Sequence, residues 1–185
     1  KSLSIVILPI ALLVIAMCSI QGGAALAKSL FPLVGAEGTT ALRLSLAALI
    51  LGLVMRPWRT RLNIAAWRAL VAYGAALGGM NLMFYMSLKT VPLGIAVSLE
   101  FTGPLLLAIL SSRRAIDFVW VVLAVCGLAL LLPSQLTDAP LDPTGAALAL
   151  GAGACWALYI IFGQKAGAAH GAQTVALGTL VAALI

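Results

Sequence analysis

The sequence contains very little charge. Only 9% of its 185 residues are Asp, Glu, Lys or Arg, with five acids against eleven bases. A soluble domain carries about 25% charged residues to cover its surface, so this composition excludes one. With 63% hydrophobic residues and a mean hydropathy of +1.16, we predict an all-α polytopic membrane protein, a bundle of transmembrane helices.

Histidine and cysteine are also scarce. Cys18, Cys126 and Cys155 lie inside apolar runs without C-x-x-C or Cys/His spacing, so we interpret them as small core residues and expect no metal site or disulfide. An intramembrane enzyme would need several acids, bases or metal ligands. The predicted spans offer one acid, and His170 is placed in a loop. We therefore expect no enzyme and no cofactor, and the bases, scattered over short loops, indicate no nucleic-acid partner.

Apolar runs of spanning length recur along the chain. They predict helices at about residues 5–27, 39–55, 69–88, 93–110, 118–132 and 145–164, with a further run from 175. The polar linker 133–144 separates a first five-helix unit, 1–132, from the start of a second unit, 145–185. Because the last run is too short to span, we expect a fragment of a longer protein. An alternative for the first run is a signal peptide that is cleaved after Ala27.

The bases are distributed unevenly among the predicted loops. If the amino terminus is cytoplasmic, eight bases lie on the cytoplasmic side and only Lys28 and Lys89 lie outside, with Arg43 left out as intramembrane. Cytoplasmic loops of membrane proteins carry an excess of Lys and Arg. We therefore expect a cytoplasmic amino terminus and a periplasmic linker at 133–144.

One acid, Glu100, lies about halfway along the apolar stretch from Val91 to Arg114. An ionised carboxylate in lipid is costly, so Glu100 should face the protein interior or a water-filled cavity and serve a proton, an ion or a substrate. Pro104, next to Gly103, removes a backbone hydrogen bond from the carbonyl of Glu100, which predicts a helix break that lines a cavity. The alternative is a kinked packing helix with a protonated, hydrogen-bonded Glu100.

Four more polar side chains lie within predicted spans. Asn81 and Tyr85, at i and i+4, share a helix face and suit hydrogen bonding to a polar solute, although bonding between helices explains Asn81 equally well. Gln21 lies beside two glycines that would let another backbone come close or the helix open. For Arg43, one turn inside its helix, we expect snorkelling to the headgroups, with pairing to a carboxylate as the alternative.

Glycines mark where helices are expected to pack closely. Gly74 and Gly78, at i and i+4 of the third run, form a small-x-x-x-small seam, which is a structural feature. The run at 118–132 holds no ionisable group, so we expect it to be scaffold.

The sixth run resembles the first. Residues 18–28 and 155–165 both begin with cysteine and end with lysine, and both lie within predicted helices that are rich in Ala and Gly. Five predicted crossings separate them, and an odd number inverts the second copy, as in the inverted repeats of secondary transporters. In this second unit, Trp156 and Tyr159 are the candidates for lining a cavity.

Six segments resemble a known family. They read SIQGGAALAKSLFPLVGA, TALRLSLA, GGMNLMFYMSL, TVPLGIAVSLEFTGPLLLAILSSRR, DFVWVVLAV and ALALGAGACWALYI, and the most specific part is VPLGIAVSLEFTGP. They are similar to the drug/metabolite transporter superfamily in its EamA-like branch of bacterial inner-membrane exporters, and most of all to members that export threonine and homoserine. The resemblance implies ten helices in two inverted five-helix units, of which this chain would hold about six and a half.

The leading hypothesis is an exporter of small polar amino acids, driven by proton antiport with alternating access. Glu100 would accept the substrate ammonium, and Arg43 or helix termini at the break would receive the carboxylate. The first alternative is an efflux pump for lipophilic or cationic compounds, whose aromatic cage would come from Phe84, Phe101 and Tyr85. The second is a non-transporting assembly subunit. The lipid bilayer is the expected partner, and a homodimer is one of the assemblies considered.

Overall fold

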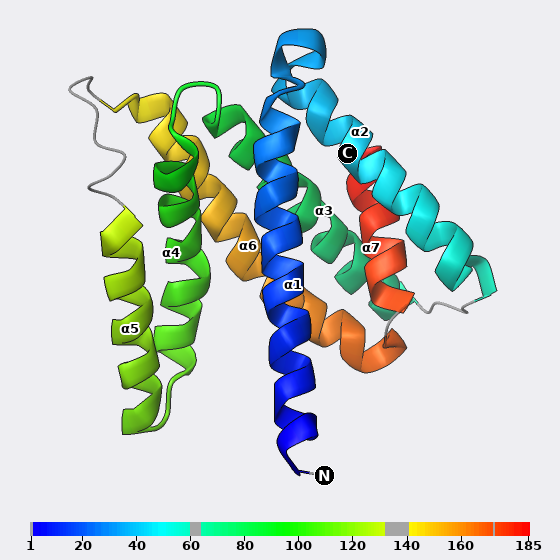
Figure 1. Cartoon of the computed structure of the whole chain (residues 1–185). Coiled ribbons are helices and arrows are strands. Elements are labelled where there is room, and N and C mark those ends of the chain that lie inside the picture. Colours follow the sequence, from blue (N-terminus) through cyan, green and yellow to red (C-terminus); the bar gives the residue numbers. More distant parts are fainter. Residues whose placement is uncertain (1, 60–63, 132–140, 172) are drawn as a thin grey trace.

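The computed structural model describes residues 2–59, 64–131, 141–171 and 173–185. Within these ranges the chain is almost entirely helical and contains no strand (Figure 1). The elements are α1 (Ser2–Lys28), α2 (Phe31–Met55), the short 3-10 turn η1 (Pro57–Arg59), α3 (Ile64–Ser87), α4 (Leu93–Ser111), α5 (Ala115–Leu131), α6 (Pro143–His170) and α7 (Gln173–Leu184). The predicted all-α bundle is confirmed.

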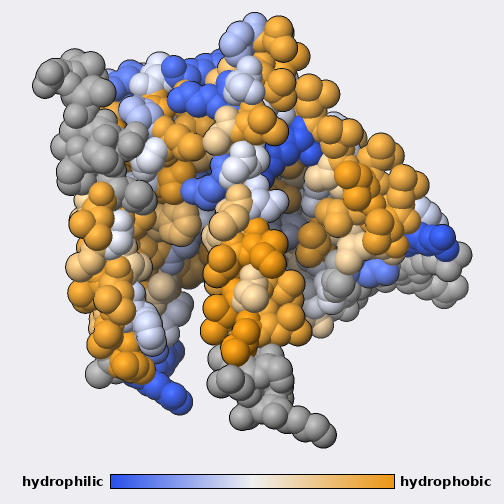
Figure 2. Space-filling model, viewed as in Figure 1, coloured by the Kyte–Doolittle hydropathy of each residue, from blue (hydrophilic) through white to orange (hydrophobic). Residues whose placement is uncertain are grey.

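Five of the helices, α1, α2, α3, α4 and α6, are long and apolar enough to cross a membrane. The shortest, α4, has 19 residues, and at about 1.5 Å per residue it matches a hydrocarbon core of about 30 Å. Apolar side chains cover the outward faces of α1 and α5 (Figure 2), where Leu13 is 59% and Trp120 is 65% exposed. The chain is therefore a multi-pass membrane protein whose surface suits lipid.

Helix α6 lies at the centre of the packing. It makes its most extensive contact with α3 and its second with α4, and α7 packs against α3 and α2. The main neighbour of α5 is α4, and that of α1 is α2, so these two helices lie at the periphery (Figure 1). Packing between membrane helices depends on close approach of their backbones. The two most extensive contacts between helices both involve α6.

The crossing of α4 and α6 is a direct backbone contact. A Cβ atom added to Gly153 would lie 2.5 Å from the carbonyl oxygen of Glu100, and one added to Gly103 would collide with the carbonyl oxygen of Gly153. Since only the Cα hydrogens of glycine fit there, the Cα–H of Gly153 faces the carbonyl that Pro104 deprives of its helical donor. This contact fixes the position of Glu100 against α6.

The predicted glycine seam on α3 is confirmed. A Cβ at Gly74 would lie 2.6 Å from the Cβ of Val181, and one at Gly78 would lie 3.2 Å from the carbonyl oxygen of Ala182. The partner is α7, which the seam allows to lie directly against the α3 backbone.

The expected helix break at Gly103 and Pro104 is wrong. Helix α4 continues from Leu93 to Ser111 with Pro104 inside it, so no break occurs at Gly103 and Pro104. The break lies instead at Gly35, with φ 72° and ψ 175°, where a turn beginning at Phe31 joins the rest of α2. A positive φ is readily adopted by glycine, whereas proline keeps a helical φ and costs α4 one hydrogen bond.

Helix α6 is longer than the sequence predicts. It begins at Pro143 because the Asp142 carboxylate accepts hydrogen bonds from the N–H groups of Thr144 and Gly145, at 3.3 and 2.8 Å. It ends at His170, so that residue belongs to a helix end and not to a loop. Most of the predicted linker 133–144 lies outside the described residues.

The cap of α6 is tied to the turn between α3 and α4. The Thr90 hydroxyl donates a 2.7 Å hydrogen bond to Oδ2 of Asp142. This bond has the largest effect on the pKa of Asp142, and the hydrogen bond from the N–H of Gly145 has the next largest. Both lower the pKa below its ordinary value, because they stabilise the charged form. Lys89, the residue before Thr90 in the same turn, forms a 2.6 Å ion pair with Glu37 of α2.

Candidate functional site

A cavity of about 270 Å³ lies among α1, α2, α3, α4 and α6. It gathers side chains that are far apart in the sequence, and six of its lining residues are those that the sequence analysis selected: Gln21, Arg43, Asn81, Glu100, Trp156 and Tyr159. The seventh candidate, Tyr85, lies outside the lining.

Glu100 is the acid of this cavity. Its side chain is on the buried part of α4, with 8% of the residue exposed, and it has no hydrogen-bond or ion-pair partner in the part of the chain that the structure describes. The only buried and unsatisfied polar atom of the described residues is Oε1 of Gln173, so the oxygens of Glu100 are open to the cavity. A carboxylate in such a place needs water, a proton or a solute as its partner.

Arg43 turns inward, so the expected snorkelling to the headgroups is wrong. Its Nη1 donates a 2.6 Å hydrogen bond to the hydroxyl of Tyr85, and its guanidinium carbon lies 5.6 Å from the centre of that ring. The acceptor oxygen and the aromatic face hold the cation at the cavity wall. Its predicted pairing with a carboxylate is not formed either, since no ion pair within 4.0 Å joins Arg43 to Glu100.

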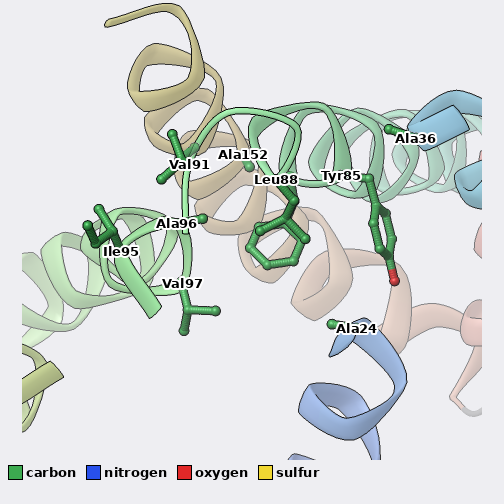
Figure 3. Close-up of a cluster of buried hydrophobic side chains, with 11 residues drawn as sticks. Ala24, Ala36, Tyr85, Leu88, Val91, Ile95, Ala96, Val97 and Ala152 are labelled. Carbon is green, nitrogen blue, oxygen red and sulfur yellow. The ribbon is translucent and has the colours of Figure 1, made fainter. Parts of the chain in front are cut away.

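Tyr85 lies behind Arg43 and not in the cavity wall. It is 0% exposed, and it belongs to the buried cluster shown in Figure 3, together with Leu88, Val91 and Ile95. The rings of Phe31 and Phe84 meet it edge-on, with centroids at 6.0 and 5.9 Å. The sequence selected this residue for contact with a solute, but the structure gives its hydroxyl to Arg43.

Asn81 lines the cavity without joining two helices. Its Nδ2 donates a 2.9 Å hydrogen bond to the carbonyl oxygen of Leu77, one turn earlier in α3. Within the described residues its side-chain amide has no partner on another helix, which argues against its role as a bridge between helices. The amide oxygen remains as an acceptor for a solute.

Aromatic rings form much of the remaining wall. Trp156 of α6 and Phe101 of α4 meet edge-on with centroids 4.8 Å apart. Tyr159 stacks on Tyr73 at 4.7 Å, and the Tyr73 hydroxyl donates a 3.1 Å hydrogen bond to that of Tyr159. Such rings supply both apolar surface and, from Tyr159, a polar group.

Several lining residues were not predicted, although the helical spacing in the sequence indicates them. On α1 the lining residues are Met17, Ile20, Gln21 and Ala24, and on α3 they are Leu77, Met80, Asn81 and Phe84. Both sets follow i, i+3, i+4 and i+7, which is one face of a helix. The polar member of each set therefore marks the face that turns toward the cavity. No comparable signal indicates Tyr73.

Comparison with curated proteins gives strong matches. The chain is 64% identical, over 178 residues and 96% of its length, to the threonine/homoserine exporter RhtA of Escherichia coli K12. The identity and coverage are the same for the threonine/homoserine exporter RhtA of Salmonella typhimurium LT2. The chain is similar to threonine/homoserine exporters. The predicted similarity to members that export threonine and homoserine is thereby confirmed.

The match covers only part of these relatives. The chain spans 60% of the length of each of them. No family model matches the chain, and no solved structure matches it either.

Proposed function

We propose that this chain belongs to a transporter that exports threonine, homoserine and similar small polar amino acids across the bacterial inner membrane. The observation that carries the proposal is Glu100, an acid at membrane depth that opens to a cavity and has no partner among the described residues. The similarity to exporters named for threonine and homoserine supports the choice of substrate. An exporter fits this site better than an enzyme does, because the cavity offers one acid and no set of groups for catalysis.

Glu100 also provides a simple route to proton antiport. In its ionised form it accepts the substrate ammonium, and in its protonated form it has no charge for the ammonium to pair with. Proton and substrate therefore compete for one carboxylate. If the cavity opens alternately to the two sides, a proton that enters from the periplasm displaces substrate outward and is released to the cytoplasm.

The polar lining of the cavity favours a small polar solute. Five helices, α1, α2, α3, α4 and α6, each contribute one polar group to it: Gln21, Arg43, Asn81, Glu100 and Tyr159. A small molecule with several polar groups matches this arrangement.

The test is uptake of labelled threonine into inverted membrane vesicles that carry the complete gene product and an imposed proton gradient. We expect Glu100→Gln to lower gradient-driven uptake at least tenfold, because the carboxylate can no longer exchange a proton for an ammonium. The matched control is Glu37→Gln, which removes an exposed acid that pairs with Lys89 and should leave uptake within about twofold. Unchanged uptake by Glu100→Gln would remove Glu100 from the mechanism.

Efflux of lipophilic cations is the second candidate, and the aromatic wall favours it. Four aromatic residues line the same cavity as the acid: Phe84, Phe101, Trp156 and Tyr159. Arg43 argues against cation efflux, because its positive charge at the cavity wall repels a cationic substrate. Resistance of cells that overexpress the protein separates the two: protection against toxic amino-acid analogues supports the exporter, and protection against cationic dyes supports the alternative.

We further propose that the amino terminus is cytoplasmic and that the whole transporter has two inverted five-helix units. The excess of bases on one side supports the orientation, and the matching segments 18–28 and 155–165 support the inversion. In a cysteine-free background, Lys89→Cys should react with an impermeant thiol reagent added outside. Labelling only after permeabilisation would reverse the orientation.

A further inference from the structure

We propose that Arg43, held in place by Tyr85, receives the substrate carboxylate and thereby selects free amino acids over amines of the same shape. This inference rests on the proposed function and extends it from the ammonium end of the substrate to the other end. In it, Arg43 is a binding residue, and Tyr85 is a positioning residue that acts through Arg43.

Arg43 is a cation without a counter-ion among the described residues. Three of the acids in these ranges are engaged elsewhere: Glu37 with Lys89, Asp117 with the backbone at the start of α5, and Asp142 with Thr90 and the cap of α6. The fourth, Glu100, lies on the same cavity with no ion pair to Arg43 within 4.0 Å. Arg43 is half-buried, and a cation that loses part of its water is stabilised by a counter-ion, so this site favours an anion.

The guanidinium has donors left for that anion. It carries five N–H groups in a rigid plane, and within the described residues its one hydrogen bond to another side chain goes from Nη1 to the Tyr85 hydroxyl, at 2.6 Å. The remaining N–H groups can donate to both oxygens of a carboxylate in the paired geometry that arginine favours.

Tyr85 restricts where the guanidinium can lie. Its ring is fully buried and is held edge-on by Phe31 and Phe84, and Arg43 lies over its face at 5.6 Å. An arginine on a flexible side chain would lose much conformational freedom when it binds substrate. Anchoring it beforehand reduces that loss, which is the physical reason for a tyrosine at this position.

The cavity therefore presents an acid and a cation that form no direct ion pair with each other within 4.0 Å. An α-amino acid carries the two complementary charges on groups that are bonded to the same carbon atom, and it can satisfy both. An amino alcohol, in which the carboxylate is replaced by a hydroxymethyl group, would leave Arg43 without its partner. The absence of this ionic interaction should weaken binding at least tenfold.

The experiment compares L-threonine with L-threoninol, its amino alcohol, as competitors of labelled threonine uptake into inverted vesicles that carry the complete gene product. For the unmodified protein we expect threoninol to compete at least tenfold less well. Arg43→Gln should raise the half-saturating concentration of threonine about tenfold. It should also bring the ratio of the half-inhibiting concentrations of threoninol and threonine close to one. A purely structural role of Arg43 would lower the amount of active protein but leave that ratio unchanged.

Tyr85→Phe is the second variant, because it keeps the buried ring and removes only the hydroxyl. We expect a severalfold rise in the half-saturating concentration with little change in the maximal rate, and a smaller ratio of the competitors. If Arg43→Gln does not fold, this variant and the unmodified protein still decide the matter.

The outcomes separate this inference from the proposed function. Equal competition by threonine and threoninol in the unmodified protein, or an unchanged ratio in both Arg43→Gln and Tyr85→Phe, would overturn the role of Arg43 while export stands. Absence of any threonine transport by the unmodified protein would instead overturn the proposed function.

Discussion

Two hollows lie along the same pair of helices, and they differ in chemistry. The cavity of about 270 Å³ contains Glu100, Arg43 and Asn81. A groove of about 730 Å³ lies between α4 and α6 and is lined mostly by aliphatic side chains such as Leu106, Ile109, Leu150 and Ile161. The larger hollow offers no charged group in its lining. Size alone would therefore select the groove, whereas the placement of charge selects the cavity, which is the site we propose.

The line where α4 meets α6 separates the two hollows. On α4, Glu100 and Phe101 turn toward the cavity, whereas Thr102 and Gly103 turn toward the groove. On α6 the groove takes Ala154, Ala157, Leu158 and Ile161, which lie at i, i+3, i+4 and i+7 and form one helix face. The tight glycine contact between the helices thus keeps the polar cavity and the apolar groove only one residue apart along α4.

The largest effect should come from forcing this contact open. In Gly153→Val the new side chain would meet the Glu100 carbonyl, whose oxygen is 2.5 Å from the Cβ position. We expect a loss of about 3 kcal/mol or more in unfolding free energy, because neither backbone can move away easily. The matched control is Gly127→Val on α5, where nothing lies within 4 Å of the Cβ position. Thermal unfolding in detergent measures both, and equal melting temperatures would show that the contact is not tight.

A smaller effect should distinguish the walls of the two hollows. Asn81→Ala removes a polar group from the cavity, and we expect the half-saturating concentration of threonine to rise about five- to tenfold, the loss of one hydrogen bond. Leu106→Ala in the groove, where Leu106 is 57% exposed, should change it less than about twofold. The vesicle assay measures both, and an equal response from the two variants would mean that the groove takes part in transport.

The smallest effect lies outside both hollows, at the cap of α6. The Thr90 hydroxyl and the Gly145 N–H lower the pKa of Asp142 in the folded protein, so its charged form stabilises the fold above its ordinary pKa of about 4. That contribution is lost as the pH falls through and below this value. We expect Asp142→Asn to melt a few degrees lower at pH 7 and the gap to close near pH 3. A gap that is independent of pH would exclude the charge as its cause.

Much of this protein follows from sequence alone. Low charge and recurring apolar runs determine a membrane bundle, because the chain has too few charged residues to cover the surface of a soluble domain. A lone acid inside such a run is a candidate functional residue, since burying its charge is costly. The seam at Gly74 and Gly78 is likewise visible in the spacing, because the helical period fixes which residues share a face.

Other features were decided only by the tertiary structure. Pro104 was predicted to break its helix, but α6 supports the carbonyl that Pro104 frees, and the break occurs in α2, where Gly35 takes a positive φ. Arg43 faces inward because Tyr85, 42 residues further along the chain, offers it an oxygen and a ring. Periodicity assigns a residue to a face of its own helix. Which partner meets that face depends on contacts between distant segments, and these exist only once the helices have packed.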